Sequence, residues 1–483
     1  MPKRLQILFF SLFTFISVCG QGLPPVTEVR AVWLATHFGL DWPDKNKSIE
    51  SQKKDLTNML DVIKEANFNT VFFQTRLRGD ASYKSKIEPL NKNLKSSKTF
   101  DPLQFVIEEC HNRGLECHAW FITYPLGTKK HVENHGANSV VKKYPDMCIF
   151  YDDEWRLDPG HPKTKEYLLS LVDEIVSGYD IDGISFDYIR YSEAKPGFPD
   201  QKTHAKYGKG KSLQEWRRQN INSFVRDAYK LVKSKKNWVQ VSSSTIGVYQ
   251  KIAKVKGFPL TAYNDVFQDV AHWMREGIHD AIYPMMYYKN ELFDPYLLEW
   301  SKICQRRLVV PVLGIYKMLP NEKHPDNGNW STDLFYSQIK KTRQHNIKGQ
   351  GFFRTKFMVD NTKGFLSGIK RNYYKNPAKL PPLTWLNSTP PAPPRNLTIV
   401  KAGKNRIKLQ WQHSSKGDNK PSFNIYSSTS KNINLSNSSH LTAIGVRENE
   451  IILETKGGMY FTVTASDRYR NESSNSSVVY LPN

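Results

Sequence analysis

The feature that most constrains the fold of this chain is an eightfold alternation of short apolar runs and amphipathic stretches between Arg30 and about Arg371. In the amphipathic stretches, apolar residues recur at intervals of three and four, as in helices that cover a core. Continuous apolar runs are typical of parallel strands covered on both faces. Eight repeats predict an α/β fold, a (β/α)8 TIM barrel over residues 28–375, rather than an open doubly wound sheet. No glycine-rich phosphate loop follows the first run, which also disfavours the open sheet.

The expected elements of this barrel can be given by residue range. Strands are predicted at 30–36, 70–76, 115–123, 183–189, 238–247, 281–287, 308–316 and 349–355. Helices are predicted at 52–66, 103–112, 164–177, 213–231 and 333–345, among others. In such barrels the reacting groups lie at the carboxyl ends of the strands, so candidate catalytic residues are expected there.

A change of composition follows the barrel. Residues 376–394 contain Pro381-Pro382 and the run Pro390-Pro391-Ala392-Pro393-Pro394, which predicts a stiff, extended linker. Residues 395–483 contain short alternating strands separated by polar turns. That pattern predicts a small all-β sandwich of the fibronectin type III kind, with a spacer or binding role.

The first twenty residues have the pattern of a secretory signal peptide. Lys3 and Arg4 precede an apolar stretch that ends in Val18-Cys19-Gly20. Cleavage after Gly20 would release the chain, whereas cleavage before Cys19 would leave a cysteine that carries a lipid anchor. Both routes stay open, and both imply export.

The charge of the chain favours an acidic environment. The formal net charge is +23, and removal of Lys3 and Arg4 leaves +21. Such a charge attracts polyanions. The basic residues are scattered and do not cluster beside aromatic nucleic-acid motifs, so we expect no nucleic-acid site.

One repeat, residues 178–191, carries three aspartates. Asp180 and Asp182 precede the predicted strand and belong to the lower side of the barrel. Asp187 lies near the upper end, roughly 16 Å farther along an extended chain. A carboxylate there is costly to bury unless it is paired or used, and Arg190 is near enough in sequence to hold it ionised. Asp187 is therefore the candidate catalytic residue, and a structural Asp187–Arg190 pair is the alternative.

Seven segments in order give the barrel a family resemblance. They are EVRAVWL (28–34), GLDWP (39–43), CHAW (117–120), LDPG (157–160), IDGISFDYIRY (181–191), WRRQN (216–220) and YPMMY (283–287). Together they resemble glycosyl-hydrolase-like family ten, which began as a domain of unknown function. The resemblance implies a barrel, export to the periplasm or outer membrane of a bacterium, and hydrolysis of O-glycosidic bonds in a glycan. Some members resemble peptidoglycan glycosidases that act on strands stripped of peptide.

The resemblance also bears on the site. Related barrel glycosidases place the nucleophile at the end of strand four, which matches Asp187. Glycoside hydrolysis normally needs a second carboxyl group. Asp269 follows strand five and matches a family Gln-Asp; its alternative role is to cap a helix. Asp265, Glu291 and Asp41 are further alternatives. The family usually has Trp-x-Asn-Pro after strand three, and here Ile122 takes the place of the asparagine.

Other residues at predicted strand ends suit a sugar. Aromatic rings stack on apolar sugar faces, and polar or basic groups bind hydroxyls or carboxylates. The predicted substrate-binding residues are Asp41, Trp42, Gln74, Arg76, Arg190, Tyr191, Tyr287, Tyr316 and Arg354.

No metal or organic cofactor is expected. His131 and His135 have the spacing of a zinc helix, but the glutamate between them is third rather than second, so we expect a polar loop or helix surface. The preferred partner is a polysaccharide, peptidoglycan by resemblance. Another anionic polysaccharide is the alternative substrate. Glycan binding without catalysis is the alternative function. The oligomeric state is open.

Overall fold

The computed structural model describes residues 24–94, 99–193, 197–257, 260–304, 306–320, 328, 330–414 and 420–483. The predicted signal peptide, with Cys19, lies outside the described residues. Within the described part of the chain, no helix combines the length and the hydropathy that a membrane span requires.

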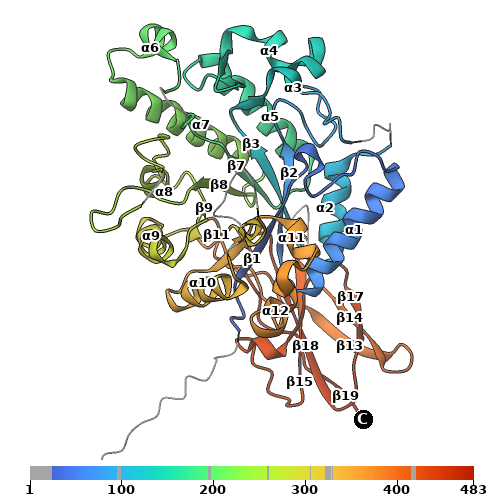
Figure 1. Ribbon diagram of the computed structural model, residues 1–483. Helices are drawn as coiled ribbons and strands as arrows, with labels where there is room; N and C mark the ends of the chain where they lie inside the picture. Colours follow the sequence, from blue (N-terminus) through green and yellow to red (C-terminus); the bar gives the residue numbers. More distant parts are fainter. Residues whose placement is uncertain are drawn as a thin grey trace, which may run out of the picture.

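A closed barrel of parallel strands forms the larger part of the molecule (Figure 1). Neighbouring strands pair in parallel, and the last pairs with the first. The predicted eight-stranded α/β barrel is therefore confirmed. In chain order its strands are β1 (Val29–Leu34), β2 (Thr70–Arg76), β3 (Glu116–Ile122), β7 (Gly183–Asp187), β8 (Gln240–Ile246), β9 (Ala281–Met285), the two-piece strand β10 (Leu308–Val309) and β11 (Val312–Leu313), and β12 (Gly349–Phe352).

The seventh strand is shorter than predicted. The sequence pattern predicts one strand over 308–316, but the structure breaks it at Pro311 and continues it as a 3-10 helix, Ile315–Met318. Proline has no amide hydrogen to donate to a neighbouring strand, which explains the break. The shortening matters for the site because it turns Tyr316 out of the strand and into the rim.

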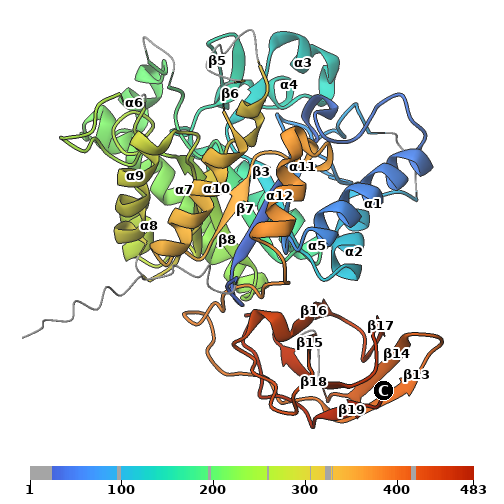
Figure 2. The ribbon, with the colours of Figure 1, turned by 60° about the horizontal axis from the view of Figure 1, so that its bottom comes forward.

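Helices surround the barrel (Figure 2), and each predicted helix is present within a few residues of its expected bounds. Several begin at a serine or aspartate that accepts a backbone hydrogen bond, such as Ser48 and Asp101. They are α1 (Ile49–Glu65), α2 (Pro102–Asn112), α5 (Pro162–Gly178), α7 (Leu213–Lys235), α8 (Val270–Arg275), α9 (Asn290–Ile303), α10 (Thr332–Gln344), α11 (Thr355–Val359) and α12 (Phe365–Asn372).

The segments between β3 and α5 and between β7 and α7 rise above the rim (Figure 1) and contain elements that the sequence pattern did not predict. A small antiparallel sheet pairs in the order β4-β6-β5. Figure 1 shows α3 and α4 above the ends of β2 and β3. The elements are β4 (Pro125–Gly127), α3 (Lys129–Asn134), α4 (Val140–Lys143), β5 (Cys148–Tyr151), β6 (Glu154–Leu157) and α6 (Gln201–Tyr207).

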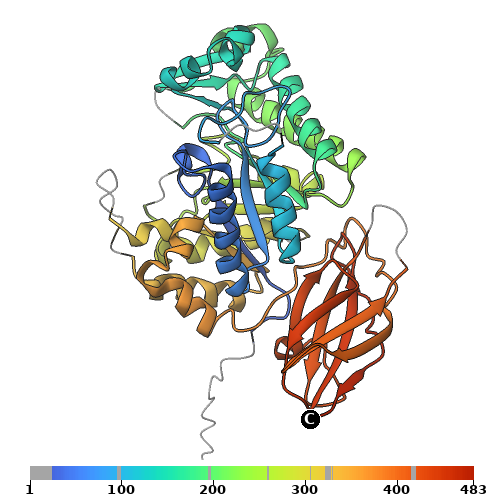
Figure 3. The same ribbon diagram turned by 90° about the vertical axis from the view of Figure 1, so that its right-hand side faces the viewer.

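An all-β domain follows the barrel, as predicted, and lies below it (Figure 3). It has two antiparallel sheets and its own apolar core, which includes Trp411 and Phe423. The fibronectin type III assignment stays a prediction. The sheets are β13-β14-β17, made of Arg395–Lys401, Arg406–Gln412 and Glu450–Glu454, and β16-β15-β18-β19, made of Leu441–Val446, Ser422–Ser428, Met459–Ser466 and Val479–Leu481.

The proline-rich segment 376–394 does more than connect the two domains. Leu383 is 1% exposed and belongs to the same apolar cluster as Trp33 and Tyr283, whose side chains fill the barrel. Trp385 packs on this cluster and donates its indole N–H to Asp280 Oδ1 at 2.8 Å. The segment therefore closes the base of the barrel, because its apolar side chains bury more favourably there than in water.

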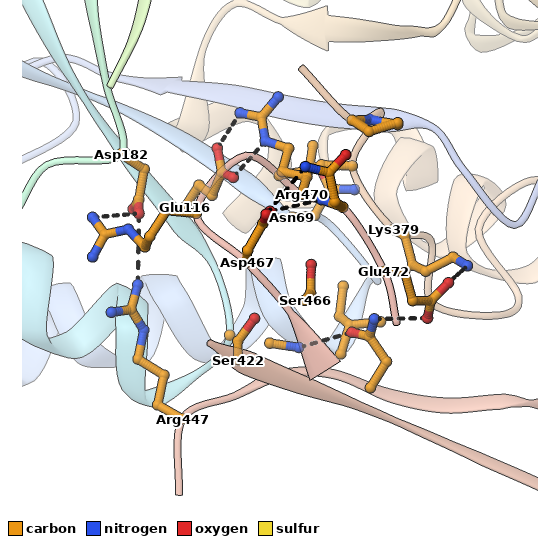
Figure 4. A pocket seen from close by; sticks show the side chains of 18 of the residues that line it. Asn69, Glu116, Asp182, Lys379, Ser422, Arg447, Ser466, Asp467, Arg470 and Glu472 are labelled. Carbon is orange, nitrogen blue, oxygen red and sulfur yellow. Dashed lines mark hydrogen bonds and ion pairs between the residues drawn. The ribbon is translucent and has the colours of Figure 1, made fainter. Parts of the chain in front are cut away.

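Charged residues join the base of the barrel to the all-β domain (Figure 4). Arg468 Nη2 lies 2.8 Å from Asp180 Oδ1 and 3.6 Å from Asp182 Oδ1. Arg447 Nη2 lies 3.5 Å from the same Asp182 oxygen. His111 Nε2 lies 2.8 Å from Asp182 Oδ2. Burial alone would raise the pKa of Asp182, but the His111 ring and the two arginines outweigh it and hold that pKa well below its usual range.

We predict that Asp182→Asn lowers the free energy of unfolding by about 3 kcal/mol at pH 7, because it breaks a buried ion pair. The depressed pKa of Asp182 contributes stability above the ordinary carboxyl pKa of about 4, and this contribution is lost as the pH falls further. The unfolding free energies of the two proteins, measured in urea, should therefore begin to converge below about pH 4 and approach each other further as the pH falls. Asp146→Asn, at an exposed position, is the control. A difference that stays constant from pH 7 to pH 3 would contradict this role.

Candidate active site

Asp187 ends β7 at the rim of the barrel, where its side chain is 8% exposed. Trp120 Nε1, from the neighbouring strand β3, donates to Asp187 Oδ2 at 3.0 Å. The backbone N–H of Tyr188 donates to Oδ1 at 2.7 Å. Tyr188 adopts a φ of 50°, in the left-handed region, where a non-glycine residue costs of order 1–3 kcal/mol. Strained backbone of this kind is concentrated at functional sites.

The environment of Asp187 sets its protonation. Burial raises the pKa of the carboxyl group above its ordinary value, and Arg190, the two hydrogen bonds and Arg78 partly oppose that rise. Arg190 Nη1 is 3.8 Å from Asp187 Oδ1. A buried carboxyl group with a raised pKa and a specific positive partner is typical of a catalytic group.

Aromatic rings form one wall beside Asp187. The ring centroids of Tyr287, Tyr316 and Phe353 lie 5.7–6.0 Å from one another, and the Trp120 centroid lies 6.2 Å from that of Phe353. Burial raises the pKa of Tyr287, and the charge of Asp187 adds to the rise, so the phenol stays protonated. Such rings suit contact with the apolar face of a sugar.

Arginines surround the same carboxylate. The Arg190 guanidinium lies 4.3 Å from the Tyr188 ring centroid. Its Nε and Nη1 atoms are buried and make no hydrogen bond to any described residue, which leaves donors for a hydroxyl or carboxylate. Burial lowers the pKa of Arg78 and of Arg156, and a neighbouring arginine lowers each further: the Arg156 charge acts on Arg78, and the Arg190 charge acts on Arg156.

Two further carboxyl groups lie one arginine away from Asp187. Glu193 Oε2 is 3.8 Å from Arg190 Nε. Glu154, on β6, forms an ion pair with Arg78, and its Oε2 is 3.2 Å from Arg156 Nη2. The side chain of Glu154 is 20% exposed and that of Glu193 is 44% exposed, so a substrate has access to both.

Asp269, the predicted second catalytic carboxyl group, makes the helix-capping contacts that were its alternative role. Its Oδ1 accepts the backbone N–H of His272 at 3.3 Å and caps the start of α8. Tyr249 also donates to Oδ1, at 3.4 Å. No hydrogen bond or ion pair joins Asp269 to Asp187 among the described residues, so the capping role is the one that the structure supports.

The three alternatives to Asp269 also have local roles. Asp265 accepts hydrogen bonds from the N–H and hydroxyl of Thr261, each at 2.7 Å. Glu291 is exposed in the first turn of α9. Asp41 accepts the N–H groups of Ala35 and Lys356 at 2.7 and 2.9 Å and is paired with Arg354. Asp41 and Arg354 therefore tie together the loops after β1 and β12.

The predicted substrate-binding residues lie in different surroundings in the structure. Arg190, Tyr287 and Tyr316 gather around Asp187, as expected from their strand ends. Gln74 lies at the rim, but its Oε1 accepts the N–H groups of Thr36 and His37 at 2.9 and 2.8 Å. Gln74 therefore positions the β1 loop.

Three predicted contacts are buried in packing instead. Trp42 is 1% exposed and donates to the Gln52 carbonyl at 2.7 Å, so its ring covers α1. Tyr191 is also 1% exposed, with its hydroxyl bonded to Asn220. Arg76 is fully buried against Glu88. The register between β2 and β3 shifts between Gln74 and Arg76, which turns Arg76 away from the barrel interior.

Sequence reasoning missed several residues of the site. Trp120 and Phe353 lie near strand ends and were within reach of the same rule that selected Tyr287. Tyr188 directly follows Asp187, but its left-handed backbone has no sequence signal for a residue with a side chain. Arg78 follows β2 and Glu154 begins β6, and only the tertiary structure brings these two segments together.

Comparisons with known proteins agree with this fold and show the family of the chain. The family model described as glycosyl hydrolase-like 10 matches residues 28–338. Glycosyl hydrolase YngK of Bacillus subtilis (strain 168) is 31% identical over 407 residues, which cover 79% of this chain and 79% of that protein. Glycosyl hydrolase DigH of Escherichia coli (strain K12) is 29% identical over 383 residues, 69% of this chain and 86% of that protein.

Among solved structures, the PgaB (BpsB) glycoside hydrolase domain from Bordetella bronchiseptica matches 72% of this chain and 99% of that chain. The TM-score is 0.50 at 12% identity, which shows a shared fold. The family match spans most of the barrel and includes Asp187. The chain therefore belongs to the glycosyl hydrolase-like 10 family and is a glycoside hydrolase.

Proposed function

We propose that this protein is an exported enzyme that cleaves O-glycosidic bonds in a cell-envelope glycan, with peptidoglycan strands as the substrate and Asp187 as the central catalytic residue. The observation that carries the proposal is a buried carboxyl group at the end of β7 with two hydrogen-bond donors, an aromatic wall and a neighbouring arginine. A site of this kind fits a sugar ring and a developing positive charge.

Asp187 acts in its ionised form, as nucleophile or as stabiliser of the oxocarbenium-like transition state. The Arg190 charge and the donors Trp120 and Tyr188 oppose the effect of burial and keep the carboxylate available. The Tyr287 and Tyr316 rings contact the apolar face of the sugar. The free Arg190 nitrogens bind a hydroxyl or a carboxylate of the glycan.

The second carboxyl group comes from Glu154 or Glu193. Each is one arginine away from Asp187, and each is exposed enough to meet a glycosidic oxygen or a water molecule. The pair must consist of two groups with separate tasks, because one protonates the leaving oxygen while the other bears negative charge.

Peptidoglycan is the preferred substrate on three grounds. Residues 1–20 have the pattern of a signal peptide, the net charge of the rest is +21, and the family resemblance extends to glycosidases of that polymer. Strands stripped of peptide carry free carboxylates, which suit the donors of Arg190. A different anionic polysaccharide is the second candidate, favoured by the same charge.

We predict that Asp187→Asn abolishes the release of reducing ends from purified peptidoglycan, intact or stripped of peptide. Loss of the charge should lower kcat at least 10³-fold, which is on the order of the effect of removing a single essential group from a catalytic set. Thermal unfolding of the variant checks that it is folded. Activity of a folded Asp187→Asn near that of the wild type would exclude Asp187. If neither protein releases sugars from any polysaccharide but both bind, the site serves binding alone.

A second prediction concerns pH. Trp120→Phe removes a hydrogen bond to the Asp187 carboxylate, and this loss raises the pKa of Asp187 further. The acid limb of kcat/KM should therefore move to higher pH by roughly 0.5–1 unit, since such a bond is worth about 1 kcal/mol. Trp238→Phe is the matched control, because its indole N–H makes no hydrogen bond within the described residues. An unchanged acid limb in Trp120→Phe would show that Asp187 is not the group that titrates.

A third prediction distinguishes the carboxyl groups. Asp269→Asn should keep near-wild-type activity, because asparagine also caps helices well. Of Glu154→Gln and Glu193→Gln, one should lower kcat by about 10²–10⁴, as loss of a general acid does. Sodium azide is added to each variant as an external nucleophile, and rescue identifies the group that activates water. If Asp269→Asn alone loses activity, the assignment made from the sequence is right and the present one is wrong.

A further inference from the structure

A group of histidines and a carboxylate lies beside the rim, outside the groups assigned to catalysis. Asp80 follows β2, and His131 and His135 are one turn apart on and just after α3. Asp80 Oδ1 lies 3.5 Å from His131 Nε2, and Asp80 Oδ2 lies 3.8 Å from His135 Nε2. The sequence predicted a polar helix surface here, but α3 turns both rings toward Asp80.

The spacing of these atoms suits one small cation. One ligand atom from each of the three residues lies within 4.8 Å of the others. Four ligands at the usual zinc distances form a tetrahedron whose corners are about 3.4 Å apart. The observed 3.5 and 3.8 Å separations need little movement to reach that geometry. His131 Nε2 also makes a 3.1 Å hydrogen bond with the Arg78 carbonyl oxygen, and a bound cation would replace the proton of that bond.

The surroundings are closed rather than solvated. The side chains of Asp80, His131 and His135 are 3%, 18% and 5% exposed. A cavity of about 10 Å³ lies against both histidines, with Leu126 and Val140 among its apolar walls. That volume is close to the space that one water-sized particle occupies. A buried carboxylate is costly unless it is paired or binds a metal. A cation bound together with His131 and His135 would meet this requirement for Asp80.

The geometry points to a binding site for one divalent transition-metal ion, of which zinc fits the two imidazoles and one carboxylate best. The ion fastens the segment after β2 to α3. Arg78 lies in the segment after β2, where its backbone N–H donates to Asp80 Oδ1 at 3.0 Å. Its side chain pairs with Glu154, and its charge lowers the pKa of Asp187. The ion therefore holds an arginine of the rim in place, while Asp80, His131 and His135 are positioning residues.

The test uses the full-length protein without a histidine tag, stripped with EDTA, loaded with zinc and dialysed. Mass spectrometry of the metal content should give about one zinc ion per chain. The double variant His131→Asn/His135→Asn should lose this zinc, and calorimetric titration should show an affinity lowered by more than about 100-fold. His345→Asn, an exposed histidine on α10's end, is the matched control and should bind zinc as the wild type does.

Two further measurements guard against a variant that misfolds. Asp80→Asn keeps an oxygen for the Arg78 N–H and should still weaken zinc binding. In the wild type, zinc should raise the melting temperature and EDTA should reverse the rise, because the ion binds the folded state. Cobalt(II) should give the visible absorbance of a tetrahedral site. Zinc content in the wild type no higher than in the folded double variant would overturn the inference, whatever the enzyme's activity.

Discussion

Closure of the barrel by parallel pairing is the constraint on which the other features depend. Because all strands run in one direction, their carboxyl ends open at one rim and their amino ends at the other. Asp182 and Asp187 lie at opposite ends of the same strand, and their environments shift their pKa values in opposite directions. Arginines from the all-β domain lower the pKa of Asp182, whereas burial in the aromatic rim raises that of Asp187. One repeat therefore supplies a structural and a candidate catalytic carboxylate.

Hydrophobic periodicity was enough to predict the barrel, because strands covered on both faces must be apolar throughout. The rule that chemistry lies at carboxyl ends was enough to select Asp187. The rule failed where side-chain direction departs from strict alternation. At Arg76 a shift in register turns the side chain into the layer between strands and helices, where it pairs with Glu88. Trp42 and Tyr191 are buried by helices that no local pattern brings to them.

The register of β3 and β7 explains why one departure from the family pattern affects the site directly. Ile122 is the Cα partner of Asp187, and Trp120 is the partner of Ser185. The residue at position 122 is therefore beside the carboxylate on the adjacent strand. Ile122 is 3% exposed and packs with the apolar interior of the barrel. An apolar residue there removes a potential polar contact, whereas the nearby Arg190 has two buried nitrogens that make no hydrogen bond to a described residue.

The barrel strands and the segments above the rim contribute different parts of the candidate site. The strands place Asp187 and the indole of Trp120 through backbone pairing that tolerates little movement. Arg78 and Glu154, by contrast, come from segments that only tertiary contacts bring to the rim. Glu154 pairs with Arg78, and the Arg78 charge lowers the pKa of Asp187, an interaction that depends on the distance between the two groups. The barrel therefore determines where the candidate catalytic carboxylate lies, while the position of the segment that carries Arg78 contributes to its charge environment and its pKa.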